Sequence, residues 1–179
     1  MRLVALLALA VSILPRAGAA GDPEDELKAA IVLSFLRYGE WPKQAGTSSP
    51  LTVGVYGRPS FADVLRQTFA GKAVEDRPVR LIELKNPADG AACQIVYFAT
   101  IARDAEIKSV VQSQQYSHVL TIGEDKDFLN IGGAVNLLVV DGRMTFEVSL
   151  SALERNGVNI SSRLLRFGQI RNTKKGARS

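Results

Sequence analysis

Short apolar runs alternate with segments of helical periodicity through most of this chain. The apolar runs have the length of buried strands and cover 51–56, 79–84, 94–98, 118–122 and 134–140. Two intervening segments, 61–69 and 102–114, repeat apolar residues at helical spacing. Strands separated by helices require right-handed crossovers, which pair the strands in parallel. We therefore predict an α/β fold, a single-domain sandwich in which helices flank a mostly parallel mixed sheet.

One antiparallel hairpin is predicted after the last of these strands. Asp141-Gly142 is a strong two-residue turn signal, and Met144, Phe146 and Val148 then alternate with polar residues. We place this hairpin strand at an edge of the sheet. A helix over 149–156 and a short helix capped by Ser161 or Ser162 should complete the domain.

The first twenty residues are expected to form a secretory signal. Arg2 precedes an apolar run over 3–14, and Ala17-Gly18-Ala19 fits a cleavage site. Twelve residues make about 18 Å of helix, too short for a hydrocarbon core of ~30 Å. Cleavage after Ala19 or Ala20 would release a domain over 21–170 with a basic, disordered tail over 171–179. The alternative is an uncleaved N-terminal anchor.

The first helix of that domain carries more apolar surface than one core face can use. Asp22 can cap it, Pro23 suits its first position, and it should end near Glu40, ahead of Pro42. From 29 to 36 only Ser34 is polar. We expect an exposed apolar face that contacts a partner or a second copy of the chain.

Residues with catalytic or metal-binding potential are few. His118 is the single histidine, and the G-x-S-x-G nucleophile motif is absent. Cys93 is the single cysteine, so neither an intrachain disulfide nor a multi-cysteine metal site can form. We predict that Cys93 is an inert, buried thiol. We also predict that the protein has no catalytic residues and binds neither a cofactor nor a metal. A hydrolase with an unrecognised site remains the least supported alternative.

Residues that could bind a partner or a ligand are better candidates for a functional role than catalytic residues are. Trp41, after Glu40, is either a core anchor or a partner contact. Gly132-Gly133 is either a tight turn or a flexible joint. Arg163 and Arg166 share a helix face, where they are solvated or form an anion-binding fork.

Five blocks of sequence, in order along the chain, resemble one bacterial family. They are Leu27-Lys28-Ala29-Ala30 through Phe35 to Glu40-Trp41-Pro42; 92–98; Phe128 with Gly132-Gly133 and Asn136-Leu137; Phe146-Glu147-Val148; and 161–166. Together they are similar to the YfiR family of periplasmic proteins. The candidate partner- or ligand-binding residues are Phe35, Glu40, Trp41, Gly132, Gly133, Arg163 and Arg166.

The resemblance implies a periplasmic, non-enzymatic inhibitor. Its partner would be the periplasmic sensor domain of an inner-membrane diguanylate cyclase, so that loss of the inhibitor raises cyclic di-GMP and favours biofilm formation. Disulfides support the characterised member, and a single cysteine makes redox control doubtful here. The partner could instead be another membrane sensor such as a histidine kinase, and a homodimer is possible.

A small-molecule-binding module is the alternative from a different class. It would use the crevice beyond the carboxyl ends of the parallel strands, and a small anion is a possible ligand. The formal net charge is +4, and no nucleic acid partner is expected.

Overall fold

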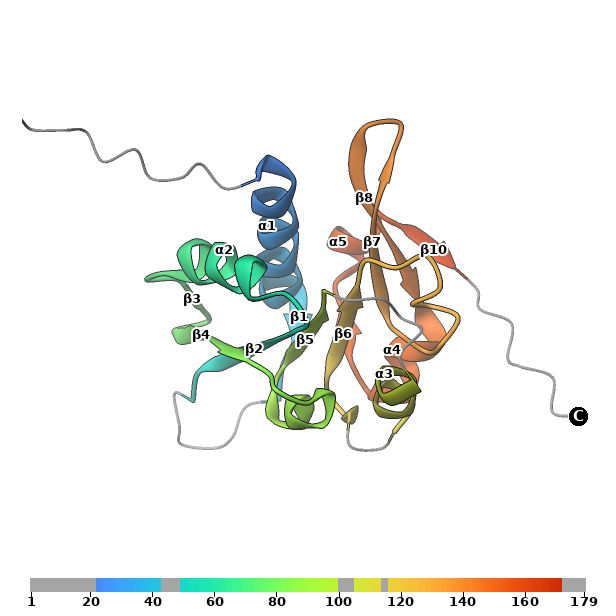
Figure 1. Ribbon diagram of the computed structural model, residues 1–179, viewed down its shortest axis with the longest axis horizontal. Coiled ribbons are helices and arrows are strands. Elements are labelled where there is room, and N and C mark those ends of the chain that lie inside the picture. The colour runs from blue at the N-terminus through green and yellow to red at the C-terminus, as the bar shows by residue number, and fades with distance from the viewer. Residues whose placement is uncertain (1–21, 43–48, 100–104, 114–115, 172–179) are drawn as a thin grey trace, which may run out of the picture.

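The computed structural model describes residues 22–42, 49–99, 105–113 and 116–171 (Figure 1). The predicted signal over 1–20 lies outside these residues, as does the predicted tail from 172 onward. Within the described residues, no helix combines the length and apolar character needed to cross a bilayer.

An eight-stranded sheet forms the middle of the structure, in the order β10-β8-β7-β6-β5-β2-β4-β3. Its strands are β2 (Leu51–Tyr56), β3 (Ala73–Val74), β4 (Arg77–Glu83), β5 (Ile95–Phe98), β6 (Leu120–Gly123), β7 (Val135–Val140), β8 (Arg143–Ser149) and β10 (Gln169–Arg171). The run from β4 through β2, β5 and β6 to β7 is parallel throughout. The predicted mostly parallel mixed sheet is thus confirmed.

We predicted from the sequence that the hairpin strand β8 lies at an edge of the sheet, and this prediction is wrong. It pairs antiparallel with β7 through Val135↔Val148 and Val140↔Arg143, but β10 pairs with its other side in parallel. All three residues of β10 are exposed. A strand this short and exposed has no apolar alternation from which a sequence pattern could predict it. Arg171, which we had assigned to the tail, is its last residue.

Helices cover both faces of the sheet (Figure 1). The helices are α1 (Pro23–Tyr38), α2 (Pro59–Phe69), the 3-10 helix η1 (Pro87–Ala92), α3 (Ala105–Val111), α4 (Leu150–Asn156) and α5 (Ser162–Leu165). Helix α1 packs between α2 and α5 on one face, whereas η1 and α3 pack together on the other. The predicted helix over 102–114 corresponds to α3, and the ends of that range lie outside the described residues.

Helix α1 ends two residues earlier than we predicted. Gly39 and Glu40 leave the helix to form β1 (Gly39–Glu40), which pairs antiparallel with β9 (Asn159–Ile160). At its start, Asp22 accepts a hydrogen bond from the Glu24 amide at 3.0 Å, as the capping signal indicated.

The core has two parts, one on each face of the sheet. Strand β5 divides them, because Ile95 and Tyr97 belong to the cluster under α1 and α2, and Val96 and Phe98 to the cluster under α3. All four side chains of β5 are fully buried. The prediction of a buried strand over 94–98 is therefore confirmed.

Candidate functional site

Trp41 closes the C-terminal end of α1. Its indole Nε1 donates a hydrogen bond to the Leu36 carbonyl at 2.8 Å, which satisfies one of the free carbonyls of the last turn. The ring is half-buried and packs against the core cluster under α1. A side chain at Gly39 would overlap the indole, so this position needs glycine. Trp41 is thus a structural anchor with one edge left at the surface.

Strand pairing brings the segment after α4 alongside this helix end. Glu40 lies opposite Asn159, whose Nδ2 donates to Glu40 Oε2 at 3.2 Å. The Ser161 amide donates to the Tyr38 carbonyl at 2.8 Å. The Ser161 hydroxyl also caps α5 by accepting from the Arg163 amide at 3.3 Å, as one of our two capping alternatives predicted. Residues distant in sequence therefore meet at one junction.

Helix α5 and the two residues that follow it present two arginines and an aromatic ring beside that junction. Arg163 and Arg166 are both exposed. The Arg166 guanidinium lies 5.0 Å from the centre of the Phe167 ring, which is 66% exposed. Aromatic residues and arginine are the residue types enriched in protein interfaces.

We call this junction the α1–α5 surface. It comprises Tyr38, Glu40, Trp41, Arg163, Arg166 and Phe167. The predicted exposed apolar face of α1 continues it, because Leu27 is 47% and Tyr38 43% exposed and Ile31 is half-buried. Ala30 is exposed as well, whereas Ala29, Val32, Leu33, Phe35 and Leu36 are buried.

Phe35 does not belong to the site. It is fully buried and meets Phe146 edge to face, with ring centres 5.1 Å apart. A partner cannot contact it in the folded protein. The family block that suggested Phe35 as a binding residue reflects its place in the core.

Gly132 and Gly133 also lie apart from the α1–α5 surface. Gly132 has φ +108°, and its carbonyl accepts a hydrogen bond from Arg155 at 2.5 Å. Gly133 is buried against the ring of Phe128, where a Cβ would overlap the ring. These contacts favour the tight-turn interpretation of the pair over a flexible joint.

The crevice beyond the carboxyl ends of the strands is occupied by charged side chains of the protein. Lys28 lies between Glu124, to which it donates a hydrogen bond, and Glu24 at 2.8 Å. Arg58 pairs with Asp25 and lies 3.8 Å from Glu124. We call these five residues the carboxyl-end cluster. Ion pairs that connect α1 with the segments after β2 and β6 therefore lie at the predicted location for a small-molecule site.

Burial and pairing act in opposite directions on Lys28. Burial lowers the pKa of its ammonium group, but the hydrogen bonds and charges of Glu124 and Glu24 outweigh burial and raise the pKa above 10.5. Lys28 therefore stays charged at neutral pH. Lysine is rarely buried unless paired, and no local sequence pattern indicates the distant carboxylate at Glu124.

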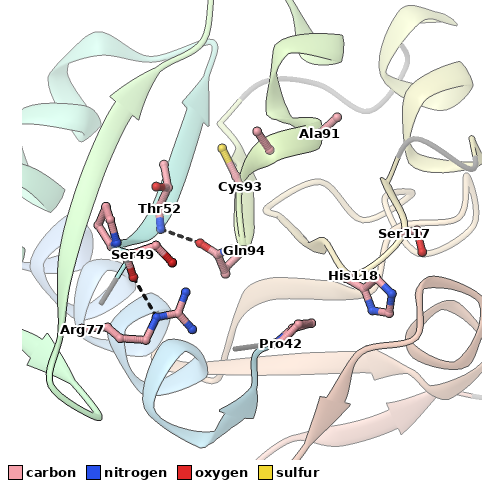
Figure 2. Close-up of a pocket in the computed structure, with 11 residues that line it drawn as sticks. Pro42, Ser49, Thr52, Arg77, Ala91, Cys93, Gln94, Ser117 and His118 are labelled. Carbon is pink, nitrogen blue, oxygen red and sulfur yellow. Dashed lines mark hydrogen bonds between the residues drawn. The ribbon is translucent and has the colours of Figure 1, made fainter. Parts of the chain in front are cut away.

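A cavity of about 380 Å³ opens at the opposite, amino edge of the sheet (Figure 2). Its lining comes from the residues that precede β2, β5 and β6, from the starts of β2 and β4 and from η1. These residues are Pro42, Ser49, Pro50, Thr52, Arg77, Ala91, Ala92, Cys93, Gln94, Ser117 and His118. Sequence reasoning missed this cavity, because its walls come from segments that are far apart in the chain.

Cys93 lies in the wall of this cavity with 3% of its side chain exposed. Burial raises the pKa of the thiol from 9.0 to about 11, so the thiol stays protonated at neutral pH. A protonated, buried thiol is a poor nucleophile, which supports the predicted inert role.

We expect Cys93→Ala to lower the free energy of unfolding by about 1 kcal/mol at neutral pH and to leave regulation intact. Between pH 9.0 and about 11 the unfolded chain loses the thiol proton while the folded protein keeps it. The stability of the parent should therefore fall with pH over this interval relative to the variant. Urea unfolding across the interval measures both effects. Equal pH dependence, or a folded variant without regulation, would contradict the inert role.

Among the described residues, no group of three or more histidine, cysteine, aspartate or glutamate side chains is placed to hold a metal ion.

Comparison with a solved structure supports the fold. A crystal structure of a conserved domain protein from Vibrio cholerae O1 biovar El Tor strain N16961 superposes with a TM-score of 0.51 at 13% sequence identity. The superposition covers 82% of this chain and 59% of that chain, so the present chain spans less than two thirds of the Vibrio protein. At this identity the likeness concerns the fold alone.

The sequence matches the YfiR/HmsC-like family over residues 25–169. This range contains all the helices and strands of the described structure except the first two residues of α1 and the last two of β10. The family is periplasmic, and its members are regulators connected with diguanylate cyclases rather than enzymes. The protein is therefore a member of the YfiR/HmsC-like family.

Proposed function

We propose that this protein binds the periplasmic sensor domain of an inner-membrane diguanylate cyclase through the α1–α5 surface and holds the cyclase inactive. The signal over 1–20 would be cleaved during export. The observation that carries the proposal is the family match, since it spans 25–169 and so includes every residue of this surface. The exposed aromatic and arginine side chains there supply the contacts that a protein partner requires.

Inhibition requires that the surface distinguish two states of the sensor. A protein that bound both states equally would shift no population. A difference of about 1.4 kcal/mol in binding free energy changes the population ratio tenfold. Arg163 and Arg166 are suited to this task, because a change in the position of acidic groups on the sensor would alter their pairing.

We expect the double variant Arg163→Glu, Arg166→Glu to raise cyclic di-GMP in cells toward the level of a gene deletion. Both side chains are exposed, so the purified variant should keep its fold. Reversing two charges should weaken binding of the sensor by about tenfold or more. Quantification of cyclic di-GMP in cell extracts provides the measurement. Trp41→Ala is a poorer probe, because the indole also closes α1.

Arg143→Glu is the matched control, since Arg143 is an exposed arginine at the β7–β8 turn. It should leave cyclic di-GMP unchanged. Unchanged cyclic di-GMP in the deletion strain, with the cyclase expressed, would contradict the proposal. A dimer that the double variant converts to monomer without any effect on cyclic di-GMP would instead assign the surface to self-association.

The cavity at the amino edge favours a second candidate function. Under this second candidate function, the protein is a periplasmic sensor module that binds a small molecule and acts on another signalling protein, such as a histidine kinase. A shift in melting temperature caused by a small molecule without any protein partner would support this candidate.

A further inference from the structure

The cavity at the amino edge of the sheet contains a positive charge, Arg77, that has no acidic partner among the described lining residues. Arg77 is 8% exposed, and its Nε donates to the Ser49 carbonyl at 2.8 Å. None of the described residues that line the cavity is acidic. Burying a cation is costly unless an anion or several acceptors compensate it. The remaining nitrogens of the guanidinium are therefore available to an anion.

Polar groups beside Arg77 can complete the recognition of that anion. Gln94 accepts a hydrogen bond from the Thr52 amide at 2.7 Å through Oε1, which fixes the side chain and leaves its amide nitrogen as a donor. In Figure 2, Arg77 lies on one side of the cavity, and Ser117 and His118 lie on the other. A guanidinium with hydroxyl and amide groups nearby matches the bidentate geometry of a carboxylate.

The rest of the lining is apolar. Pro42, Pro50, Ala91, Ala92 and Cys93 form this part of the wall. The volume of about 380 Å³ lies within the range typical of small-molecule sites, roughly 300–1,000 Å³. The cavity thus offers a charged group together with apolar side chains, at a size that suits a small metabolite.

We propose that this cavity binds a small organic carboxylate, whose acid group pairs with Arg77 and whose body contacts the proline and alanine side chains of the lining. The site is distinct from Arg163 and Arg166, the anion-binding candidates from the sequence. It does not depend on the identity of the protein partner, because it belongs to the free protein. Pro42 follows Trp41 directly, so the ligand would lie next to the α1–α5 surface.

The test titrates the purified protein with benzoate and with benzamide, its uncharged counterpart, and follows the backbone and side-chain amide signals by NMR. Benzoate should produce saturable shifts at Thr52, Gln94 and Ser117. Benzamide should bind at least about tenfold more weakly, because it cannot pair with the guanidinium. Inorganic phosphate distinguishes a site for carboxylates from a site for any oxyanion.

Arg77→Met should weaken benzoate binding by about tenfold or more. Arg80→Met is the matched control, because it removes an exposed arginine of the same strand that does not line the cavity, and it should leave binding unchanged. If Arg77→Met does not fold, the comparison of benzoate with benzamide on the unaltered protein still decides the question. Equal binding of the two compounds, tighter binding of phosphate than of benzoate, or no saturable shift at the cavity would overturn the proposal.

Discussion

Gly133→Ala should lower the free energy of unfolding by about 3 kcal/mol, at the upper end of the usual effect of overpacking. The added methyl group would overlap the ring of Phe128, which is 1% exposed and enclosed by the core cluster under α3. Because the ring is buried, relieving the overlap requires the ring, strand β7 or the preceding turn to shift. Chemical denaturation followed by circular dichroism measures the loss.

Two further variants separate overlap from other effects of replacing a glycine. Gly142→Ala, at φ +73° with open space around it, should cost about 1 kcal/mol from backbone strain alone. Combining Gly133→Ala with Phe128→Leu should cost less than the sum of the two single changes, because the smaller side chain makes room for the methyl group. Simple additivity would show that the overlap is not the cause. A Gly133→Ala protein as stable as its parent would restore the flexible-joint interpretation.

The main helices and central strands could be predicted because their signals are local. In α2, Phe61, Leu65 and Phe69 recur at helical spacing and are all buried. In β8, Phe146 and Val148 alternate with half-buried residues. Each pattern lies within a few residues of the chain, so one sequence suffices to detect it.

The missed strands depend on partners far away in the chain. Strand β1 has two residues and exists because Gly39 and Glu40 pair with β9 more than a hundred residues later. Strand β10 pairs with β8, and all three of its own residues are exposed. Neither has a periodic pattern, since two or three residues cannot display one. Their positions follow from the packing of α1 and α5.

The candidate site could be predicted only in part for the same reason. Trp41, Arg163 and Arg166 were found because tryptophan and paired arginines are unusual at any position. Arg77 looks like an ordinary polar residue at the start of a strand, and only the fold brings it beside Gln94 and Thr52. Phe35 was wrongly included, because a family block does not distinguish a core residue from a contact residue.

Lys28→Met should lower the free energy of unfolding by about 3 kcal/mol, near the lower end of the usual cost of breaking a buried ion pair. The side chain of Lys28 is 9% exposed and that of Glu124 only 20%, so removal of the ammonium group leaves Glu124 with little solvent and with Arg58 at 3.8 Å. Because pairing raises the pKa of Lys28 above 10.5, its contribution is present throughout the neutral range and is lost only as the pH rises beyond that value.

A double-mutant cycle assigns this loss to the pair rather than to the lysine alone. Lys28→Met combined with Glu124→Leu should recover part of the stability, because two apolar side chains replace two buried charges. Glu24→Gln is the matched control, since this carboxylate also pairs with Lys28 but is 50% exposed, and it should cost less than about 1 kcal/mol. If Glu24→Gln were as damaging as Lys28→Met, the stabilisation would come from the first turn of α1. If neither changed stability, the carboxyl-end cluster would not hold α1 to the sheet, and the crevice that it fills could open to a ligand.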